Sequence, residues 1–300
     1  MSVTKETKIQ TDPALALSVA LDSGSFFQVK QMMKTLSTAG IAHLLESSPP
    51  KTRSVLWELI DKNDEGEVLQ HLNEDIQNEF LKELDAKQVA EITEGLATDD
   101  LVDILQQLPQ KITSQVLSAM DAQDRSRVET VLSYDEDTAG GLMNTDTITV
   151  RPAHTLELIL RYLRRHDALP EMTDNLYVVN REDEFMGAIP LRTLLVSDPN
   201  TLASEVMLDD VKGIHVDMDS EQVAQLFERY DWVSAPVIST GNKLLGRITI
   251  DDIVDVIRDS TEHSFMSMAG LDEEDDTFAP VIKTARRRAP WLGVNLTTAV

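Results

Sequence analysis

Apolar residues recur every twelve positions between residues 56 and 132. Within each unit they are three or four residues apart, the spacing that brings side chains onto one face of an α-helix. A period of twelve therefore predicts a helix of about two turns, a tight turn and then the next helix. Helices this short cannot bury a core alone, so the pattern predicts a stacked, superhelical array, an α-solenoid. Three apolar series carry the pattern: Leu56, Val68, Phe80, Ile92, Ile104, Val116 and Val128; Trp57, Leu69, Leu81, Leu105 and Leu117; and Ile60, Leu72, Leu84, Leu96, Leu108, Met120 and Leu132.

Residues that favour turns and helix starts recur at matching positions between the predicted helices. They are Asn73, Asp85, Thr98-Asp99, Pro109 and Asp121. Two polar residues, Thr93 and Glu129, interrupt the second apolar series. The array ends before the turn-prone residues 135–141, so we expect an all-α domain over residues 1–135.

After residue 135 the pattern changes to alternating strands and helices, and it occurs twice. Residues 176–195 match residues 235–254 at an offset of 59. Each copy has an apolar strand, a polar turn, a second strand that contains Gly187 or Gly246, and then a helix. A short strand (147–150 or 213–216) and an amphipathic helix (156–165 or 221–229) precede them. The duplication predicts two α/β domains of β-α-β-β-α order, at residues 136–200 and 201–262.

Composition and charge restrict the function. The chain has 52 acidic and 27 basic residues and a formal net charge of −25. This argues against a nucleic-acid partner, because phosphate binding needs clustered Lys and Arg. The absence of Cys excludes disulfides and thiolate metal sites, and fits a reducing compartment. The six His residues are scattered and no nucleophile–base pair stands out, so we do not expect an enzyme.

Carboxylates gather where the last predicted helix of the second copy begins. Asp251 and Asp252 lie at the helix start, where free backbone N–H groups favour carboxylates. Asp255 and Asp259 follow at intervals of four residues, so like charges share one helix face and repel each other. Such a face is either solvated acidic surface or the binding surface of a divalent cation that neutralises it. We favour the cation.

The last segment, residues 263–300, is predicted to lead to a membrane. Arg286, Arg287 and Arg288 precede Trp291 and a short apolar stretch, which is the order found at the cytoplasmic edge of a membrane helix. Crossing a bilayer takes about 20 apolar residues, and the chain contains no such run. We therefore expect a connecting helix and the start of a first transmembrane segment, in a chain that is a fragment of a longer protein.

The duplicated unit, residues 136–262, resembles a pair of CBS domains. Members of that family that bind adenine nucleotides carry the motif Gly-x-x-Thr/Ser-x-x-Asp, in which the hydroxyl and the carboxylate hold phosphate and ribose at a helix start. The second copy matches this motif with Gly246, Thr249 and Asp252. The first copy has Pro190 and Thr193 at the last two positions. The resemblance therefore implies one candidate site for a nucleotide such as ATP, not two.

The order of the parts resembles the cytosolic portion of MgtE-type magnesium transporters, over essentially the whole chain. Residues 134–143, 249–255 and 290–292 look like signatures of that family. The resemblance implies a homodimeric Mg²⁺ channel or transporter of the inner (plasma) membrane. Its domains on the cytoplasmic side sense Mg²⁺ and close the pore when Mg²⁺ is sufficient. The chain's own transmembrane domain is then expected beyond residue 300.

The same resemblance implies a set of Mg²⁺ ligands. In the helical domain they are Glu67, Asp99 and Asp103; in the CBS pair they are Asp219, Glu221, Asp231, Asp252 and Asp255, with the backbone carbonyl of Glu228; and just beyond them are Asp259 and Glu262. His263 departs from the family pattern, because an acidic ligand is expected there. Carboxylate oxygens suit Mg²⁺, which keeps several waters and takes one or two protein carboxylates per ion.

These observations give one main hypothesis and two alternatives. In the main hypothesis, Mg²⁺ binds between the acidic faces of the helical domain and the CBS pair and favours the closed state. Removal of the ion then lets like charges push the domains apart. The alternatives are a CBS regulatory module that senses an adenine nucleotide, and a non-catalytic scaffold, because the helical array also resembles modules of the flagellar motor switch.

Overall fold

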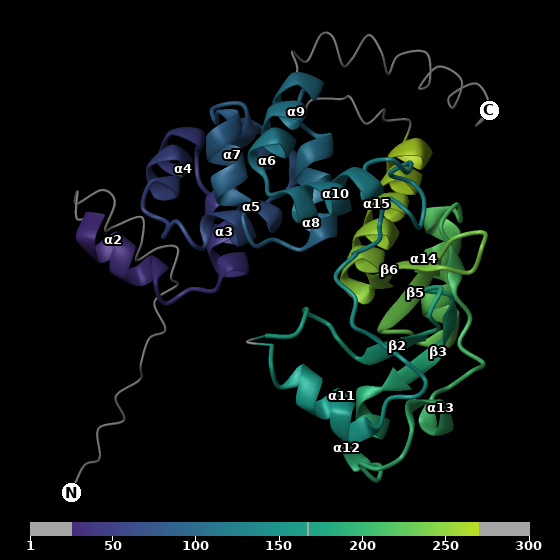
Figure 1. Cartoon of the computed structure of the whole chain (residues 1–300). Coiled ribbons are helices and arrows are strands. Elements are labelled where there is room, and N and C mark those ends of the chain that lie inside the picture. Colours follow the sequence, from purple (N-terminus) through teal and green to yellow (C-terminus); the bar gives the residue numbers. More distant parts are fainter. Residues whose placement is uncertain (1–25, 167, 270–300) are drawn as a thin grey trace, which may run out of the picture. The chain divides into compact units, whose positions relative to one another are not determined.

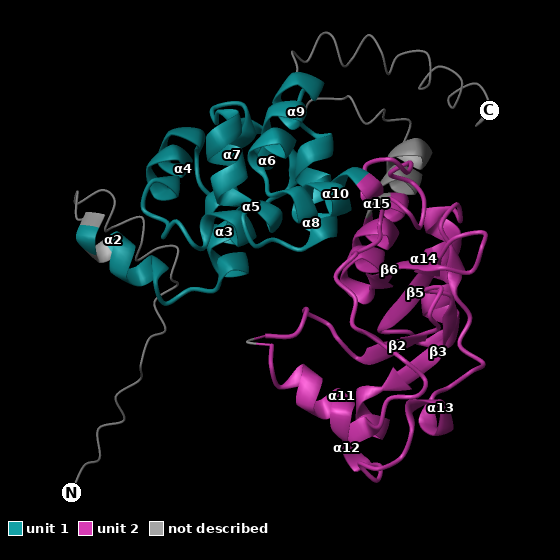
Figure 2. Ribbon diagram, in the orientation of Figure 1, with its two compact units in different colours: residues 1–129 teal, residues 130–300 magenta. Residues whose placement is uncertain are grey.

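The computed structural model describes residues 26–166 and 168–269 (Figure 1). The chain divides into two compact units, Met1–Glu129 and Thr130–Val300 (Figure 2). The predicted connector falls largely on residues 270–300, which lie outside the described residues. Among the described helices, none combines the length and the apolar content needed to cross a membrane.

The first unit is an array of short helices, as the twelve-residue period predicts. The helices described in it are α2 (Phe26–Met33), α3 (Thr38–Glu46), α4 (Pro50–Trp57), α5 (Glu65–Gln70), α6 (Glu74–Leu81), α7 (Ala86–Ile92), α8 (Thr98–Gln106), α9 (Gln110–Ala119) and α10 (Ala122–Val131). Successive helices from α3 to α10 begin twelve residues apart, except that α5 begins three residues later than the period would place it.

The predicted apolar series form the core of this array. Leu56, Val68 and Val116 are fully buried. Thr93, which interrupts one series, is also buried, and its hydroxyl donates to the Val89 carbonyl at 2.8 Å, so the buried polar group is satisfied. Asn73 and Asp85 cap α6 and α7 as predicted, and Asp85 forms a capping box with Gln88. The predicted cap at Thr98-Asp99 is wrong by one or two residues, because the N-cap of α8 is Ala97.

The second unit contains the two predicted β-α-β-β-α copies. The first consists of β1 (Thr149–Val150), α11 (Leu156–Leu163), β2 (Asn175–Val179), β3 (Phe185–Pro190) and α12 (Leu191–Val196); after the short α13 (Ala203–Val206), the second consists of β4 (Ile214–His215), α14 (Ser220–Tyr230), β5 (Ser234–Ile238), β6 (Leu244–Thr249) and α15 (Ile250–Ala269). Each copy forms a three-stranded sheet with one parallel and one antiparallel strand pair. The long strands of the two copies are related by the predicted offset of 59.

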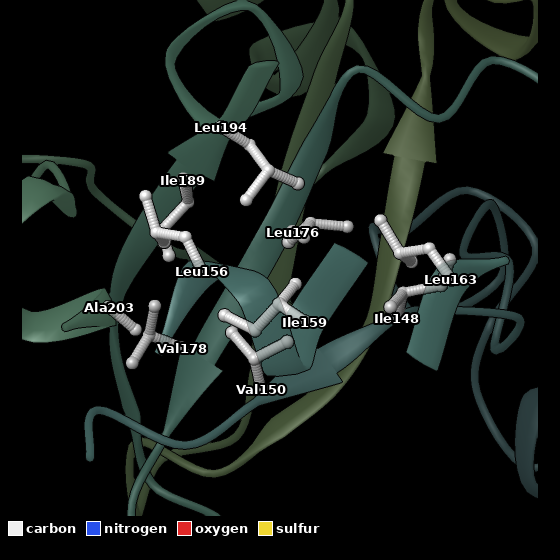
Figure 3. Close-up of a cluster of buried hydrophobic side chains, with 10 residues drawn as sticks. All are labelled: Ile148, Val150, Leu156, Ile159, Leu163, Leu176, Val178, Ile189, Leu194 and Ala203. Carbon is white, nitrogen blue, oxygen red and sulfur yellow. The ribbon is translucent and has the colours of Figure 1, made fainter. Parts of the chain in front are cut away.

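Each copy has an apolar core between its sheet and its helices. Figure 3 shows that of the first copy, where Leu156 and Ile159 of α11 pack against the strands. Thr155 is the N-cap of this helix, and its hydroxyl accepts from the N–H of Leu158; the apolar residues of the helix recur at helical spacing. The members of this cluster are Ile148, Val150, Leu156, Ile159, Leu163, Leu176, Val178, Ile189, Leu194 and Ala203.

The segment that leads into each copy pairs with the sheet of the other copy. Asn144, ahead of β1, exchanges backbone hydrogen bonds of 2.8 and 2.9 Å with Arg247 of β6. In the same way Leu208, ahead of β4, exchanges bonds of 2.8 and 3.1 Å with Ala188 of β3. The two copies are therefore interlocked, a feature that the sequence pattern does not predict.

Candidate functional site

Helices α14 and α15 of the second copy pack against each other and run in opposite directions. Near one end, the Ser260 hydroxyl donates to the Glu221 carboxylate at 3.2 Å. At the other end, the N–H of Ile250, where α15 begins, donates to the carbonyl of Val233, just after α14, at 3.0 Å. The candidate ligands of the CBS pair therefore fall into two groups, one at each end of this helix pair.

The first group lies where α14 begins. Asp219 is the N-cap, and its carboxylate accepts from the N–H groups of Glu221 and Gln222 at 3.1 and 3.3 Å. Both Asp219 and Glu221 are exposed. Asp259 and Glu262 belong to the part of α15 that contains Ser260, but their side chains lie outside the described residues.

The second group lies where α14 ends and α15 begins. Glu228 belongs to the last turn of α14, and the N–H of Trp232 donates to the Phe227 carbonyl rather than to that of Glu228. Carbonyls of a last helical turn lack intrahelical partners and carry partial negative charge, which suits a cation. Asp231 follows in the left-handed conformation, with φ of 52°. At the start of α15 are Asp252 and Asp255.

The carboxylates of α15 have nearby partners. Asp255 forms an ion pair of 3.0 Å with Arg258, one turn later on the same helix. The like charge that the sequence places along this helix face is therefore partly compensated within the helix, at Asp255. Both side chains are well exposed, and such pairs contribute only about 0.3–0.5 kcal/mol, so water and ions can still reach the carboxylate.

The three candidates of the helical unit lie on neighbouring helices. Glu67 is exposed in the first turn of α5. Asp99 is buried and Asp103 exposed, one turn apart on α8. The amide of Gln70 on α5 donates to the Asp100 carboxylate on α8 at 2.5 Å, which brings the two helices together.

The candidate ligands thus occupy three surfaces: α5 with α8 in the first unit, and the two ends of the α14–α15 pair in the second. Within residues 26–166 and 168–269, no three His, Cys, Asp or Glu residues form a group that could hold a metal ion.

The two strand residues of the nucleotide-like motif serve different faces of the sheet. Thr249 is cross-strand partner to Ser234, and residues three apart on a strand point to opposite faces, so Gly246 faces away from Thr249. A Cβ atom on Gly246 would lie 2.6 Å from the Asn144 carbonyl oxygen, so the interlocked segment requires glycine there. Thr249 is 4% exposed, and its hydroxyl bonds to Asp251 and lies 3.3 Å from the Asp252 carboxylate.

A buried polar cluster between the two copies was not predicted. The Arg247 guanidinium donates to the backbone carbonyls of Glu171 and, at 3.0 Å, Met172. The Ser234 hydroxyl donates to Asp174 and lies 3.0 Å from the hydroxyl of Tyr177, which is 1% exposed. Burial raises the pKa of Tyr177 to about 12. The sequence does contain a signal for this cluster: Arg247, a cation within a largely apolar strand, stands where the first copy has Ala188.

Two family models match most of the chain. Residues 36–137 match the model described as the MgtE intracellular N domain, and residues 139–198 and 203–259 each match the CBS domain. The magnesium transporter MgtE of Thermus thermophilus is 31% identical over 292 residues, which are 96% of this chain and 65% of that protein. This chain therefore spans less than two thirds of that relative.

Two solved structures are similar over most of this chain. One is the crystal structure of the cytosolic domain of the Mg²⁺ channel MgtE in complex with ATP, with a TM-score of 0.74 and 34% identity over 81% of this chain and 99% of that one. The other is the soluble part of a magnesium transporter, with a TM-score of 0.71 and 27% identity over 83% of this chain and 98% of that one. Both comparisons confirm the predicted fold class, a helical N-terminal domain followed by tandem CBS domains.

Proposed function

The chain belongs to the MgtE family of magnesium transporters, and from this premise we propose that it is the Mg²⁺-sensing gating region of such a transporter. Mg²⁺ bound between the acidic faces of the helical unit and the CBS pair favours the closed state. The relatives carry the name of transporters rather than enzymes, and we assign the chain no catalytic role.

The grouping of carboxylates carries this proposal. The residues that the family resemblance selects fall on two pairs of contacting helices, α5 with α8 and α14 with α15, although they are spread from residue 67 to residue 262 of the sequence. Each group offers carboxylates, and the group where α14 ends also offers a helix-end carbonyl; both are hard oxygen ligands that suit Mg²⁺. One Mg²⁺ takes one or two protein carboxylates and keeps several waters, so an ion held by one group still has coordination positions that oxygen ligands of another group can occupy.

The net charge of −25 supplies the driving force for the open state. Like charges on the two units repel each other, and a divalent cation between them replaces repulsion with attraction. The equilibrium between separated and associated units then follows the Mg²⁺ concentration, and it favours the closed pore when Mg²⁺ is abundant.

Small-angle scattering of this chain, with and without Mg²⁺, tests the proposal. We expect the radius of gyration to fall on addition of Mg²⁺ and to stay unchanged with KCl of equal ionic strength, because monovalent ions screen charge without bridging it. In the double variant Glu67→Gln, Asp103→Asn the compaction should require more Mg²⁺. The control Glu74→Gln, Asp75→Asn removes the same charge from exposed positions of α6 and should behave as the wild type. A wild-type radius that does not respond to Mg²⁺ refutes the proposal.

The same proposal includes the transmembrane domain, the membrane location and the dimer. A transmembrane domain follows residue 300, the assembly lies in the inner (plasma) membrane with this chain on the cytoplasmic side, and the protein is a homodimer. The apolar side chains of Leu195 and Val196, which are 72% and 85% exposed at the end of α12, support a partner on the first copy. Sedimentation equilibrium of the chain measures the dimer directly.

A second candidate function is adenine-nucleotide sensing. One observation favours it: the similar solved structure of an MgtE cytosolic domain is a complex with ATP. In this chain the second-copy motif Gly246, Thr249 and Asp252 is the candidate site. Titration with ATP, with and without Mg²⁺, separates the two functions, because nucleotide sensing predicts that ATP produces the larger conformational response.

A further inference from the structure

The face of the second sheet that carries Thr249 is covered by the first copy. Cross-strand partners share a face, and so do residues two apart on one strand. Ser234 pairs with Thr249 and Pro236 with Arg247, so these four side chains lie on the same face. Arg247 and Ser234 both bond to residues 171–174, the segment that enters β2 of the first copy. This segment therefore lies over the face on which a nucleotide would meet Thr249.

Three side-chain hydrogen bonds hold residues 171–174 on this face: those from Arg247 to the carbonyls of Glu171 and Met172, and that from Ser234 to Asp174. We call these bonds the Arg247 clasp. The Ser234 hydroxyl has a single proton, which goes to Asp174, so Tyr177 donates to Ser234. All bonds of the clasp join the two copies, because Ser234 and Arg247 belong to the second copy and residues 171–174 to the first.

Two observations indicate that the clasp is closed but able to open. Thr249 and Arg247 are each 4% exposed, so no ligand reaches the Thr249 hydroxyl in this arrangement. Yet the Nε atom of Arg247 is buried without a hydrogen-bond partner, which leaves a desolvated charged group incompletely satisfied. The closed state therefore carries a penalty that an open state, with the guanidinium in water, does not.

We propose that the Arg247 clasp is an autoinhibitory contact: it holds residues 171–174 over Thr249, and an adenine nucleotide binds at the Thr249–Asp252 edge only when the clasp opens. This inference rests on the second candidate function, adenine-nucleotide sensing. It is independent of the proposed bridging by Mg²⁺, which small-angle scattering tests separately.

The variant Arg247→Met keeps an unbranched side chain as far as the ε position and removes the guanidinium nitrogens that form the clasp. Arg151→Met is the matched control, because Arg151 also donates to two backbone carbonyls, those of Val179 and Asn180, but entirely within the first copy. Both variants remove one positive charge, so a general electrostatic effect on ATP is the same in both. Hydrogen–deuterium exchange of residues 171–174 and calorimetric titration with ATP at fixed Mg²⁺ are the two readouts.

In Arg247→Met we expect the amides of residues 171–174 to exchange at least tenfold faster than in the wild type and ATP to bind at least tenfold more tightly. Adding Thr249→Val should abolish the gain in affinity. Arg151→Met should match the wild type in both readouts. If Arg247→Met does not fold, Ser234→Ala, which opens the other half of the clasp, takes its place with the same expectations. An ATP affinity that is unchanged, weakened or undetectable in a folded clasp variant overturns the proposal, as does unchanged exchange at residues 171–174.

Discussion

Tyr177 reports on the contact between the two copies through its ionisation. Its hydroxyl is buried and bonded to Ser234, and burial raises its pKa from 10.0 to about 12. Because the folded state holds this proton more tightly than the unfolded chain, its contribution to stability is complete below pH 10 and is lost as the pH rises towards 12. With these two pKa values, the loss between pH 8 and pH 11 is on the order of 1 kcal/mol.

The substitution Tyr177→Phe removes both the titration and one hydrogen bond. At pH 8 we expect the variant to be less stable by about 1 kcal/mol, because Ser234 keeps its bond to Asp174. At pH 11 the wild type has lost a stabilisation of roughly 1 kcal/mol that the variant never had, so the two should be about equally stable. Urea unfolding followed by circular dichroism at both pH values measures this, and the comparison of two proteins cancels the titration of other groups. A stability gap that is the same at pH 8 and pH 11 refutes the reasoning.

Two further substitutions test the fold. Gly246→Ala places a Cβ atom 2.6 Å from the Asn144 carbonyl oxygen and should destabilise the second unit by about 1–3 kcal/mol in urea unfolding. The control Gly241→Ala, whose Cβ atom would meet only Ser239 Oγ at 3.8 Å, should change the stability far less. Equal effects of the two variants would contradict the interlocked arrangement. Asp85→Ala removes the capping box with Gln88 and should lower the unfolding free energy of the first unit by about 1 kcal/mol, with Asp85→Ser as the conservative variant that retains most of the stability.

The helical array was predictable because its signal is local. Two of the three apolar series lie within the helices and the third follows each helix by a few residues, and a turn-favouring residue stands at the start of several helices. The one break in the period, the late start of α5, also has a local cause: the N–H of Asp64 donates to the Asp61 carbonyl at 2.8 Å, and this turn delays the helix to Glu65. The ion pair between Asp255 and Arg258 is equally local, and it could be predicted from their spacing of three residues on one helix.

The interlocked segments were not predictable in this way, because their partners are distant in sequence. Asn144 bonds to Arg247, and the pairing depends on how the two copies face each other. The sequence motif therefore points to a ligand as the reason for Gly246, whereas the close approach of the Asn144 carbonyl already requires glycine there. A motif residue with a packing reason of this kind carries less information about binding than one without.

Asp252 is the residue at which the two proposed functions meet. It lies at the start of α15, its carboxylate is 3.3 Å from the Thr249 hydroxyl, and it is a candidate ligand for both Mg²⁺ and a nucleotide. Phosphate groups near Thr249 would be repelled by Asp251 and Asp252, and a cation bound there would remove much of that repulsion. If both proposals hold, Mg²⁺ at this junction must therefore favour the nucleotide. Because binding couplings are reciprocal, the nucleotide must favour Mg²⁺ by the same factor, and so bias the gating region towards the closed state.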